Sequence, residues 1–275
     1  MEQTKLQQLK QIAAKIRLGI LDGVHAASSG HPGGSLSIAE LITYLYFAEM
    51  KVDPSNPKWE DRDRLVLSKG HTAPALYAAL AEKGFFPREE LKTLRHVDSF
   101  LQGHPDMKGT PGVDMSTGSL GLGFSSACGI ALAAKLAGKD YRTYAIIGDG
   151  ESEEGQIWEA AMFASHYKLD NLCAIFDWNG LQIDGPVAEV MNPTPHDSKL
   201  EAFGFHVISI DGHDFEQIEA AFAEARAVKD KPVAIIAKTV KGKGVSYMEN
   251  QVGWHGSAPN DEQYEAAVAE IKATM

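Results

Sequence analysis

The chain of 275 residues has only two cysteines, Cys128 and Cys173, and each lies alone in an apolar segment. No disulfide framework or zinc motif can be built from them, so we expect two free thiols in a reducing compartment, the cytoplasm. No apolar run approaches the roughly 20 residues that a membrane span requires. The polar, amphipathic N-terminus differs from a signal peptide.

A surplus of positive charge is also missing. The chain has 26 Lys and Arg against 37 Asp and Glu, a formal net charge of −11. Nucleic acids and anionic membranes would repel such a chain, so we expect neither as a partner. There are no repeats and no low-complexity linker, and the 44% apolar content is typical of globular proteins. We therefore expect residues 1–275 to form a single domain.

The stretch from Tyr144 to Gly185 carries the strongest local pattern. A short apolar run ends at the sequence Gly-Asp-Gly, which contains Asp149. A segment with helical spacing follows, and a second apolar run then leads to Asn179. This pattern predicts a right-handed βαβ unit. Such a unit places Asp149 and Asn179 side by side at the carboxyl ends of parallel strands, where open α/β sheets bind ligands.

The side chains of Asp149 and Asn179 offer a carboxylate and an amide oxygen. Mg²⁺ prefers such hard oxygen ligands and often shares them with phosphate oxygens. Glycine N–H groups and a helix N-terminus favour the same phosphates. The alternatives are a dinucleotide-binding turn or an ordinary α/β loop. Since Gly-Asp-Gly differs from GxGxxG and Asn179 follows thirty positions later, the pattern favours a diphosphate held by a divalent ion.

Strands and helices alternate through the rest of the chain. We expect further strands at 64–68, 206–210 and 233–237, and helices at 5–27, 37–47, 74–83, 87–94, 124–137, 215–228 and 261–273. This order predicts an α/β fold with a doubly wound, mostly parallel sheet flanked by helices. Ser37 is expected to cap its helix in a capping box with Glu40. The helix at 124–137 is apolar nearly all round and is predicted to be fully buried.

Four histidines, His31, His71, His104 and His255, lie in loops beside glycines. One loop histidine is usually a surface residue, but four in this setting indicate a site that binds ligands or transfers protons. Zinc is the competing interpretation. The separations between these histidines do not match a compact set of zinc ligands, and no cysteine joins them.

The motifs around these residues resemble the N-terminal, diphosphate-binding part of transketolase, and the resemblance covers nearly the whole chain. They are SGHPGG at 29–34, SKGH at 68–71, GHPD at 103–106, TGSLG at 117–121, GDG at 148–150 and WHG at 254–256. The resemblance implies the thiamine diphosphate-binding (PP) fold. It also implies thiamine diphosphate and Mg²⁺ as cofactors, with Ca²⁺ or Mn²⁺ as substitutes.

The resemblance also assigns roles to residues. The metal ligands it implies are Asp149, Asn179 and the carbonyl oxygen of Leu181. The cofactor contacts are His71, Gly118, Ser119, Leu120, Gly150, Asn179, Lys238 and His255. The residues implied in catalysis are His31, His104, His255 and Glu154, with Glu154 at an interface that links two active sites.

Three further positions are interpreted with less help from the resemblance. Glu151 and Glu153 stand at a helix N-terminus, where acidic side chains commonly complement the helix dipole. Lys69, like Lys238, matches a basic position near the cofactor. The residues themselves leave open whether these two lysines contact the cofactor or are solvated at the surface.

In thiamine enzymes, the glutamate that activates the aminopyrimidine ring comes from a different domain, as do most groups that bind a sugar phosphate. We therefore expect the N-terminal subunit of a two-subunit transketolase of the pentose phosphate pathway. It would transfer a two-carbon ketol unit from a ketose phosphate to an aldose phosphate. The partner would be the C-terminal, pyrimidine-domain subunit, in an α₂β₂ assembly.

Three alternatives to a transketolase subunit remain open at this stage. Two are subunits of other thiamine diphosphate enzymes, a 2-oxoacid dehydrogenase α-chain or a deoxyxylulose phosphate synthase-like protein. Those two enzymes would not be expected to need this set of histidines. The third is a subunit that binds the cofactor without catalysis.

Overall fold

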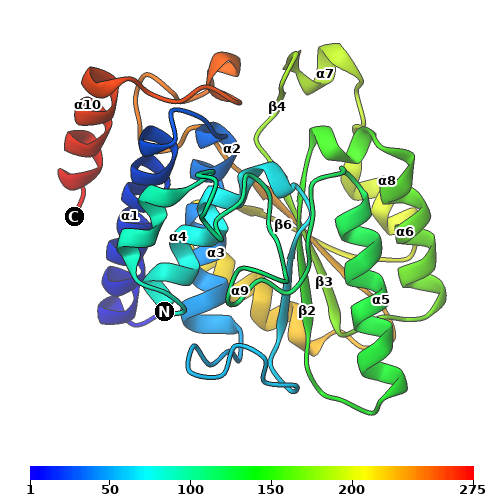
Figure 1. Ribbon diagram of the computed structural model, residues 1–275. Helices are drawn as coiled ribbons and strands as arrows, with labels where there is room; N and C mark the ends of the chain where they lie inside the picture. Colours follow the sequence, from blue (N-terminus) through cyan, green and yellow to red (C-terminus); the bar gives the residue numbers. More distant parts are fainter.

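The centre of the protein is a parallel β-sheet of five strands (Figure 1). The computed structural model describes all residues from 1 to 275. The strand order is β1-β2-β3-β7-β6, and every neighbouring pair is parallel. The strands are β1 Arg64–Leu67, β2 Thr143–Gly148, β3 Leu172–Trp178, β6 His206–Asp211 and β7 Val233–Lys238, with a small antiparallel pair of β4 Leu181–Gln182 and β5 Gly185–Pro186. The predicted α/β fold with a parallel sheet is confirmed.

Helices cover both faces of the sheet (Figure 1). One face carries α1 Gln3–Ala26, α3 Ala39–Tyr44, α4 Ala73–Lys83 and α9 Phe215–Ala227, with α10 Asp261–Lys272 packed outside α1. The other face carries α5 Leu122–Leu136, α6 Gly155–His166 and α8 His196–Ala202. The remaining short helices are α2 Pro32–Leu36 and α7 Val187–Val190. No helix in this structure combines the length and the apolar character that a membrane crossing requires.

The hydrophobic core is divided by the sheet into two clusters. Side chains alternate between the two faces along a strand. In β2, Tyr144 and Ile146 therefore pack into the cluster beneath α1 and α4, whereas Ala145 and Ile147 pack into the cluster beneath α5 and α6. Burial on both faces explains why the central strands read as continuous apolar runs rather than as alternating ones.

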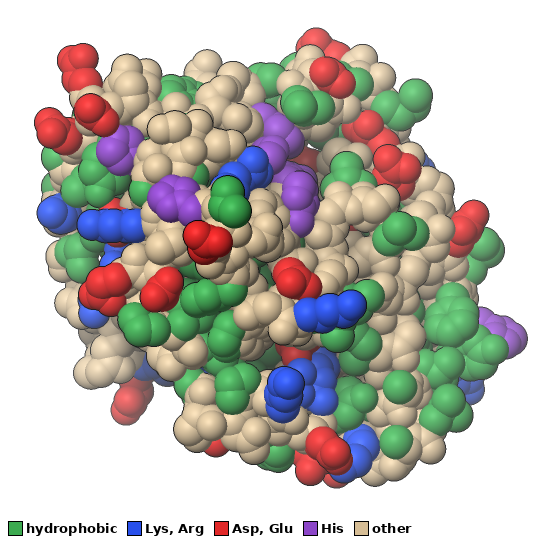
Figure 2. Space-filling model, in the orientation of Figure 1, with side chains coloured by type: hydrophobic (Ala, Val, Ile, Leu, Met, Phe, Trp, Pro, Cys, Tyr) green, Lys and Arg blue, Asp and Glu red, His purple; other side chains and the backbone are tan.

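Helix α5 differs from its prediction, because it is buried on one side only. Phe124 and Ala127 are fully buried, but Leu122 is 51% exposed and Leu136 is 81% exposed. Met162 on the neighbouring α6 and Tyr167 just after that helix are also exposed. The all-round apolar sequence of α5 therefore produces an uncovered hydrophobic flank, and Figure 2 shows hydrophobic side chains on this flank of the molecule.

The segment around Ser37 also differs from its prediction. The chain becomes helical at Pro32 and leaves the helix near Ser37, and α3 then begins at Ala39 without a side-chain cap. The Ser37 hydroxyl donates instead to the Gly34 carbonyl oxygen at 3.0 Å and to the Asp177 carboxylate at 2.7 Å. A buried acceptor outside the segment has therefore taken the hydroxyl that local sequence suggested as a cap.

That acceptor belongs to a buried ion pair beneath the carboxyl ends of the strands. Lys69 Nζ lies 2.5 Å from Asp177 Oδ2, and both side chains are almost completely buried. Lys69 also donates to the Gly34 carbonyl oxygen at 2.9 Å, and the Thr239 hydroxyl donates to Asp177. Burial alone raises the pKa of Asp177, but the Lys69 ammonium and the hydrogen bonds from Lys69, Thr239 and Ser37 together hold that pKa below its usual range. The pair joins the loops that follow β1, β3 and β7.

We predict that Lys69→Met lowers the free energy of unfolding by about 3–5 kcal/mol, because it leaves Asp177 buried without its counterion. The matched control is Lys135→Met, which breaks the partly exposed Lys135–Asp170 pair and should cost less than about 1 kcal/mol. Urea denaturation of both variants measures the difference. Equal losses would contradict the structural role given to the buried pair.

Candidate active site

A polar pocket of about 470 Å³ opens at the carboxyl ends of β1, β2 and β3. The loops after these strands supply most of its walls, and distant loops close it. Its lining includes His31, Gly34, Lys69, His71, Gly118, Leu120, Asp149, Gly150, Glu153, Glu154, Asn179, Leu181, Gln182, Lys241 and His255. Figure 2 shows histidine and basic side chains gathered around a hollow in this part of the surface.

Asp149 and Asn179 meet in this pocket as the βαβ pattern predicted. The register places Gly148 opposite Asp177, so the loops after β2 and β3 begin side by side. Asp149 Oδ1 accepts from the N–H of Gly150 at 2.8 Å, and Oδ2 accepts from the N–H of Gly180 at 2.5 Å. Asn179 Nδ2 donates to Asp177 at 2.9 Å, which fixes the orientation of its amide.

The oxygen atoms at this position fit a divalent cation. Asp149 is buried without a basic side chain in hydrogen-bond or ion-pair contact. Burial and the neighbouring charge of Asp177 raise the pKa of Asp149 to about 6. The Leu181 carbonyl oxygen accepts from the Lys241 ammonium at 3.1 Å, so this oxygen already faces a cation in the pocket. A carboxylate, an amide and a carbonyl oxygen are a donor set of the kind that Mg²⁺ takes.

Glu151 has a different role from the one its sequence position suggested. It is 2% exposed, and it accepts from the Ser68 hydroxyl at 2.5 Å and from the backbone N–H groups of Gly121 and Gly148. The side chain therefore ties the loops after β1 and β2 to the start of α5. These contacts go beyond the complement to the helix dipole that was predicted for Glu151.

Three of the four loop histidines form one cluster. The ring centroids of His31, His71 and His255 lie 5.1–5.4 Å apart. Burial, followed by the charge of Arg95, lowers the pKa of His31 to about 4. Burial and Lys241 lower the pKa of His255 to about 3, and burial and Lys69 hold the pKa of His71 well below its usual value. These imidazoles are therefore neutral near pH 7.

The loop that carries Gly70 and His71 packs closely against the loop that carries Thr117 and Gly118. A Cβ atom on Gly70 would lie 2.7 Å from the backbone carbon of Thr117, so only glycine allows the two loops to approach this closely. The same approach places Gly118 and Leu120 in the pocket wall. His104 packs against Gly118 at the rim, outside the lining itself.

Two predicted site residues lie away from this pocket. Ser119 is exposed and lines a shallow hollow beside α5 instead. Lys238 is paired with Trp178 across β7 and β3, one residue beyond the buried Asp177. Because successive side chains point to opposite faces, Lys238 faces away from this pocket.

Lys241 occupies the position that sequence reasoning gave to Lys238. Its ammonium donates to the Leu181 carbonyl oxygen and lies 2.8 Å from His255 Nδ1. Burial lowers the pKa of Lys241 to about 8. The spacing of the motif Lys-Thr-Val-Lys did not tell which lysine would turn inward, because that choice depends on where β7 ends.

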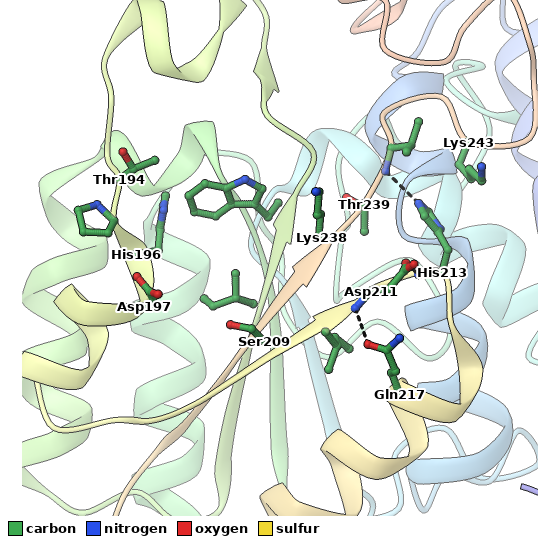
Figure 3. A pocket seen from close by; sticks show the side chains of 15 residues that line it. Thr194, His196, Asp197, Ser209, Asp211, His213, Gln217, Lys238, Thr239 and Lys243 are labelled. Carbon is green, nitrogen blue, oxygen red and sulfur yellow. Dashed lines mark hydrogen bonds between the residues drawn. The ribbon is translucent and has the colours of Figure 1, made fainter.

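Lys238 belongs to a second pocket, of about 800 Å³, at the carboxyl ends of β3, β7 and β6. In Figure 3, Lys238 and Thr239 lie between His196 on one side and His213 on the other. His213 is held by Glu40 at 2.9 Å and accepts from the N–H of Val240, so its role is structural. The pocket has mixed charges, because Asp197 and Asp211 line it together with Lys238 and Lys243.

The fold and the site define a thiamine diphosphate-binding domain, and comparison with known proteins agrees. Residues 8–273 match the family model described as transketolase, thiamine diphosphate binding domain. The chain belongs to this family. The transketolase of Campylobacter jejuni superposes with a TM-score of 0.91 at 37% identity, over 97% of this chain and 43% of that one.

Two curated relatives have nearly the length of this chain. The 6-deoxy-6-sulfo-D-fructose transketolase subunit of Clostridium sp. strain MSTE9 is 50% identical over 96% of both chains. One of the apulose-4-phosphate transketolase subunits of Phocaeicola vulgatus is 45% identical over 97% of this chain and 95% of its own. The chain is thus similar to proteins that are named as transketolase subunits.

We predict that the free energy of unfolding falls as the pH drops from about 6.5 towards 4. The folded chain keeps these imidazoles neutral while the unfolded chain protonates them, so each adds a slope of up to about 1.4 kcal/mol per pH unit. His255→Asn should make this slope shallower in urea denaturation at a series of pH values. The control is His166→Asn, which removes an exposed histidine instead of a half-buried one. An unchanged slope in His255→Asn would contradict the prediction.

Proposed function

We propose that this chain is the cofactor-binding subunit of a two-subunit transketolase that acts on sugars with an anionic end group. The observation that carries the proposal is the meeting of Asp149 and Asn179 beneath a cluster of neutral histidines. The names of the relatives, a sulfo-sugar and a sugar-phosphate transketolase subunit, support the reaction class. The reaction would transfer a two-carbon ketol unit from a ketose to an aldose.

In this proposal Asp149, Asn179 and the Leu181 carbonyl oxygen hold Mg²⁺ and, through it, the diphosphate. The N–H of Gly150 and the Lys241 ammonium would complete the diphosphate site. Thiamine diphosphate, when bound, supplies the electron sink for carbon–carbon bond cleavage. The histidines are then free to accept protons from sugar hydroxyls and to return them, because neutral imidazole is both donor and acceptor. His31 and His104 would face the sugar.

The exposed hydrophobic flank of α5 and α6 supports the proposal that a partner chain binds here. Exposed hydrophobic patches mark contact surfaces, and this one begins at Leu122, directly after the Gly118–Leu120 segment of the pocket. Glu154 is exposed at the same edge, where α6 begins. We propose that residues 1–275 act as one cofactor-binding unit and that a pyrimidine-domain subunit completes the site in an α₂β₂ assembly. We place this assembly in the cytoplasm, within the pentose phosphate pathway.

The partner proposal predicts that the chain alone shows no ketol transfer and gains activity when the pyrimidine-domain subunit is added. Coupled assays with a ketose phosphate donor and an aldose phosphate acceptor measure this. Pyruvate in place of the ketose tests the other thiamine enzymes. Robust transfer by the isolated chain, or turnover of pyruvate alone, would contradict the proposal.

The metal proposal predicts that Asp149→Asn weakens the binding of thiamine diphosphate in the presence of Mg²⁺ by roughly a hundredfold or more, since losing even an outer-sphere group commonly costs 10- to 100-fold. Isothermal titration calorimetry measures this affinity, and removal of Mg²⁺ with EDTA should have a similar effect in the unmodified chain. Asp197→Asn, in the second pocket, is the matched control. Equal affinities for Asp149→Asn and the control would exclude this metal site.

A further inference from the structure

Arg95 stands out among the seven arginines of the chain because its charge is unpaired near the active site. Five of the seven, Arg17, Arg62, Arg64, Arg88 and Arg226, form ion pairs with carboxylates. Arg142, at the opposite end of β2, donates to a backbone carbonyl oxygen. The side chain of Arg95 has one protein acceptor, the Ser29 hydroxyl, at 3.0 Å.

The backbone holds Arg95 in an unusual conformation. Its φ is +63°, in the left-handed region that arginine rarely adopts, and its N–H donates to the Leu101 carbonyl oxygen at 2.8 Å. Strained backbone of this kind persists where the surroundings determine it, and it gathers at functional sites. Here it directs the side chain back towards the loop that carries His104.

The guanidinium bridges the two loops that carry His31 and His104. It lies across the α-carbon of Gly103, where a Cβ would be 3.0 Å from Nε and 3.2 Å from Nη2. It also donates to Ser29, two residues before His31. Burial, followed by the positive charge of Arg95, lowers the pKa of both histidines. The cation therefore lies within electrostatic reach of both imidazoles, with N–H groups left over.

We infer that Arg95 binds the anionic end group of the sugar substrate, an inference that rests on the proposed function. A guanidinium presents its N–H groups as a planar fork that matches the oxygens of a phosphate or a sulfonate. Arg95 is exposed and stands outside the pocket lining, against Gly103 and next to His104. A cation at this place suits the charged end of a sugar whose reacting carbons lie inside the pocket. This chain would then supply a specificity group of its own besides those of the partner.

The test compares charged and neutral sugars in the assembled two-chain enzyme. For Arg95→Gln, we expect the KM for a ketose phosphate or a ketose sulfonate to rise roughly ten- to a hundredfold, with little change in kcat. The kcat/KM for L-erythrulose, a ketose without a charged end, should stay the same. Arg95→Lys should lie between, because it keeps the charge and loses the fork. If the KM rises for only one of the two charged sugars, the end group of that sugar is the one that Arg95 binds.

Lys92→Gln, an exposed lysine three residues earlier, is the control for general loss of positive charge and should behave like the unmodified enzyme. If Arg95→Gln impairs neutral and charged sugars alike, or lowers kcat and cofactor affinity with an unchanged KM, Arg95 only holds its loops and the inference fails. The same effect from Lys92→Gln would also overturn it. An unmodified complex without ketol transfer would instead contradict the proposed function.

Discussion

The architecture of the site depends on the buried pairing of Lys69 with Asp177. A charge without water is costly, so each partner requires the other, and each also requires the hydrogen bonds that satisfy its remaining atoms. These bonds come from Gly34 and Ser37 in the α2 segment, from Asn179 after β3 and from Thr239 after β7. The loops after β1, β3 and β7 and the α2 segment are therefore fixed relative to one another before any ligand binds.

That constraint explains which parts of the structure the sequence could predict. The βαβ unit and the parallel sheet follow from apolar periodicity and strand connection, both of which are local rules. The neighbourhood of Asp149 and Asn179 follows from the same rules, because the ends of adjacent parallel strands must meet. The motifs pointed to the loop histidines as further site residues, and the structure brings His31, His71 and His255 together.

The errors arose where a long-range contact replaced a local one. Ser37 was expected to cap a helix, but Asp177, 140 positions away, takes its hydroxyl. Glu151 was expected only to complement a helix dipole, but its carboxylate is buried and accepts from the N–H groups of Gly121 and Gly148. The choice of Lys241 over Lys238 depends on the residue at which β7 ends. Helix α5 was predicted to be buried because its sequence is apolar on all sides, but Leu122 and Leu136 on one flank are exposed.

The electrostatics of the pocket also connect ligand binding to proton transfer. Lys69, Lys241 and Arg95 surround the histidine cluster with positive charge, and this charge adds to burial in keeping the imidazoles neutral. A diphosphate near Lys69 and Lys241 would cancel part of that charge, and an anionic sugar at Arg95 would cancel more. Each imidazole would then hold a proton more readily than in the ligand-free chain. The basicity of the histidines would thus increase in steps and be highest when cofactor and substrate are both present, which is when proton transfer is needed.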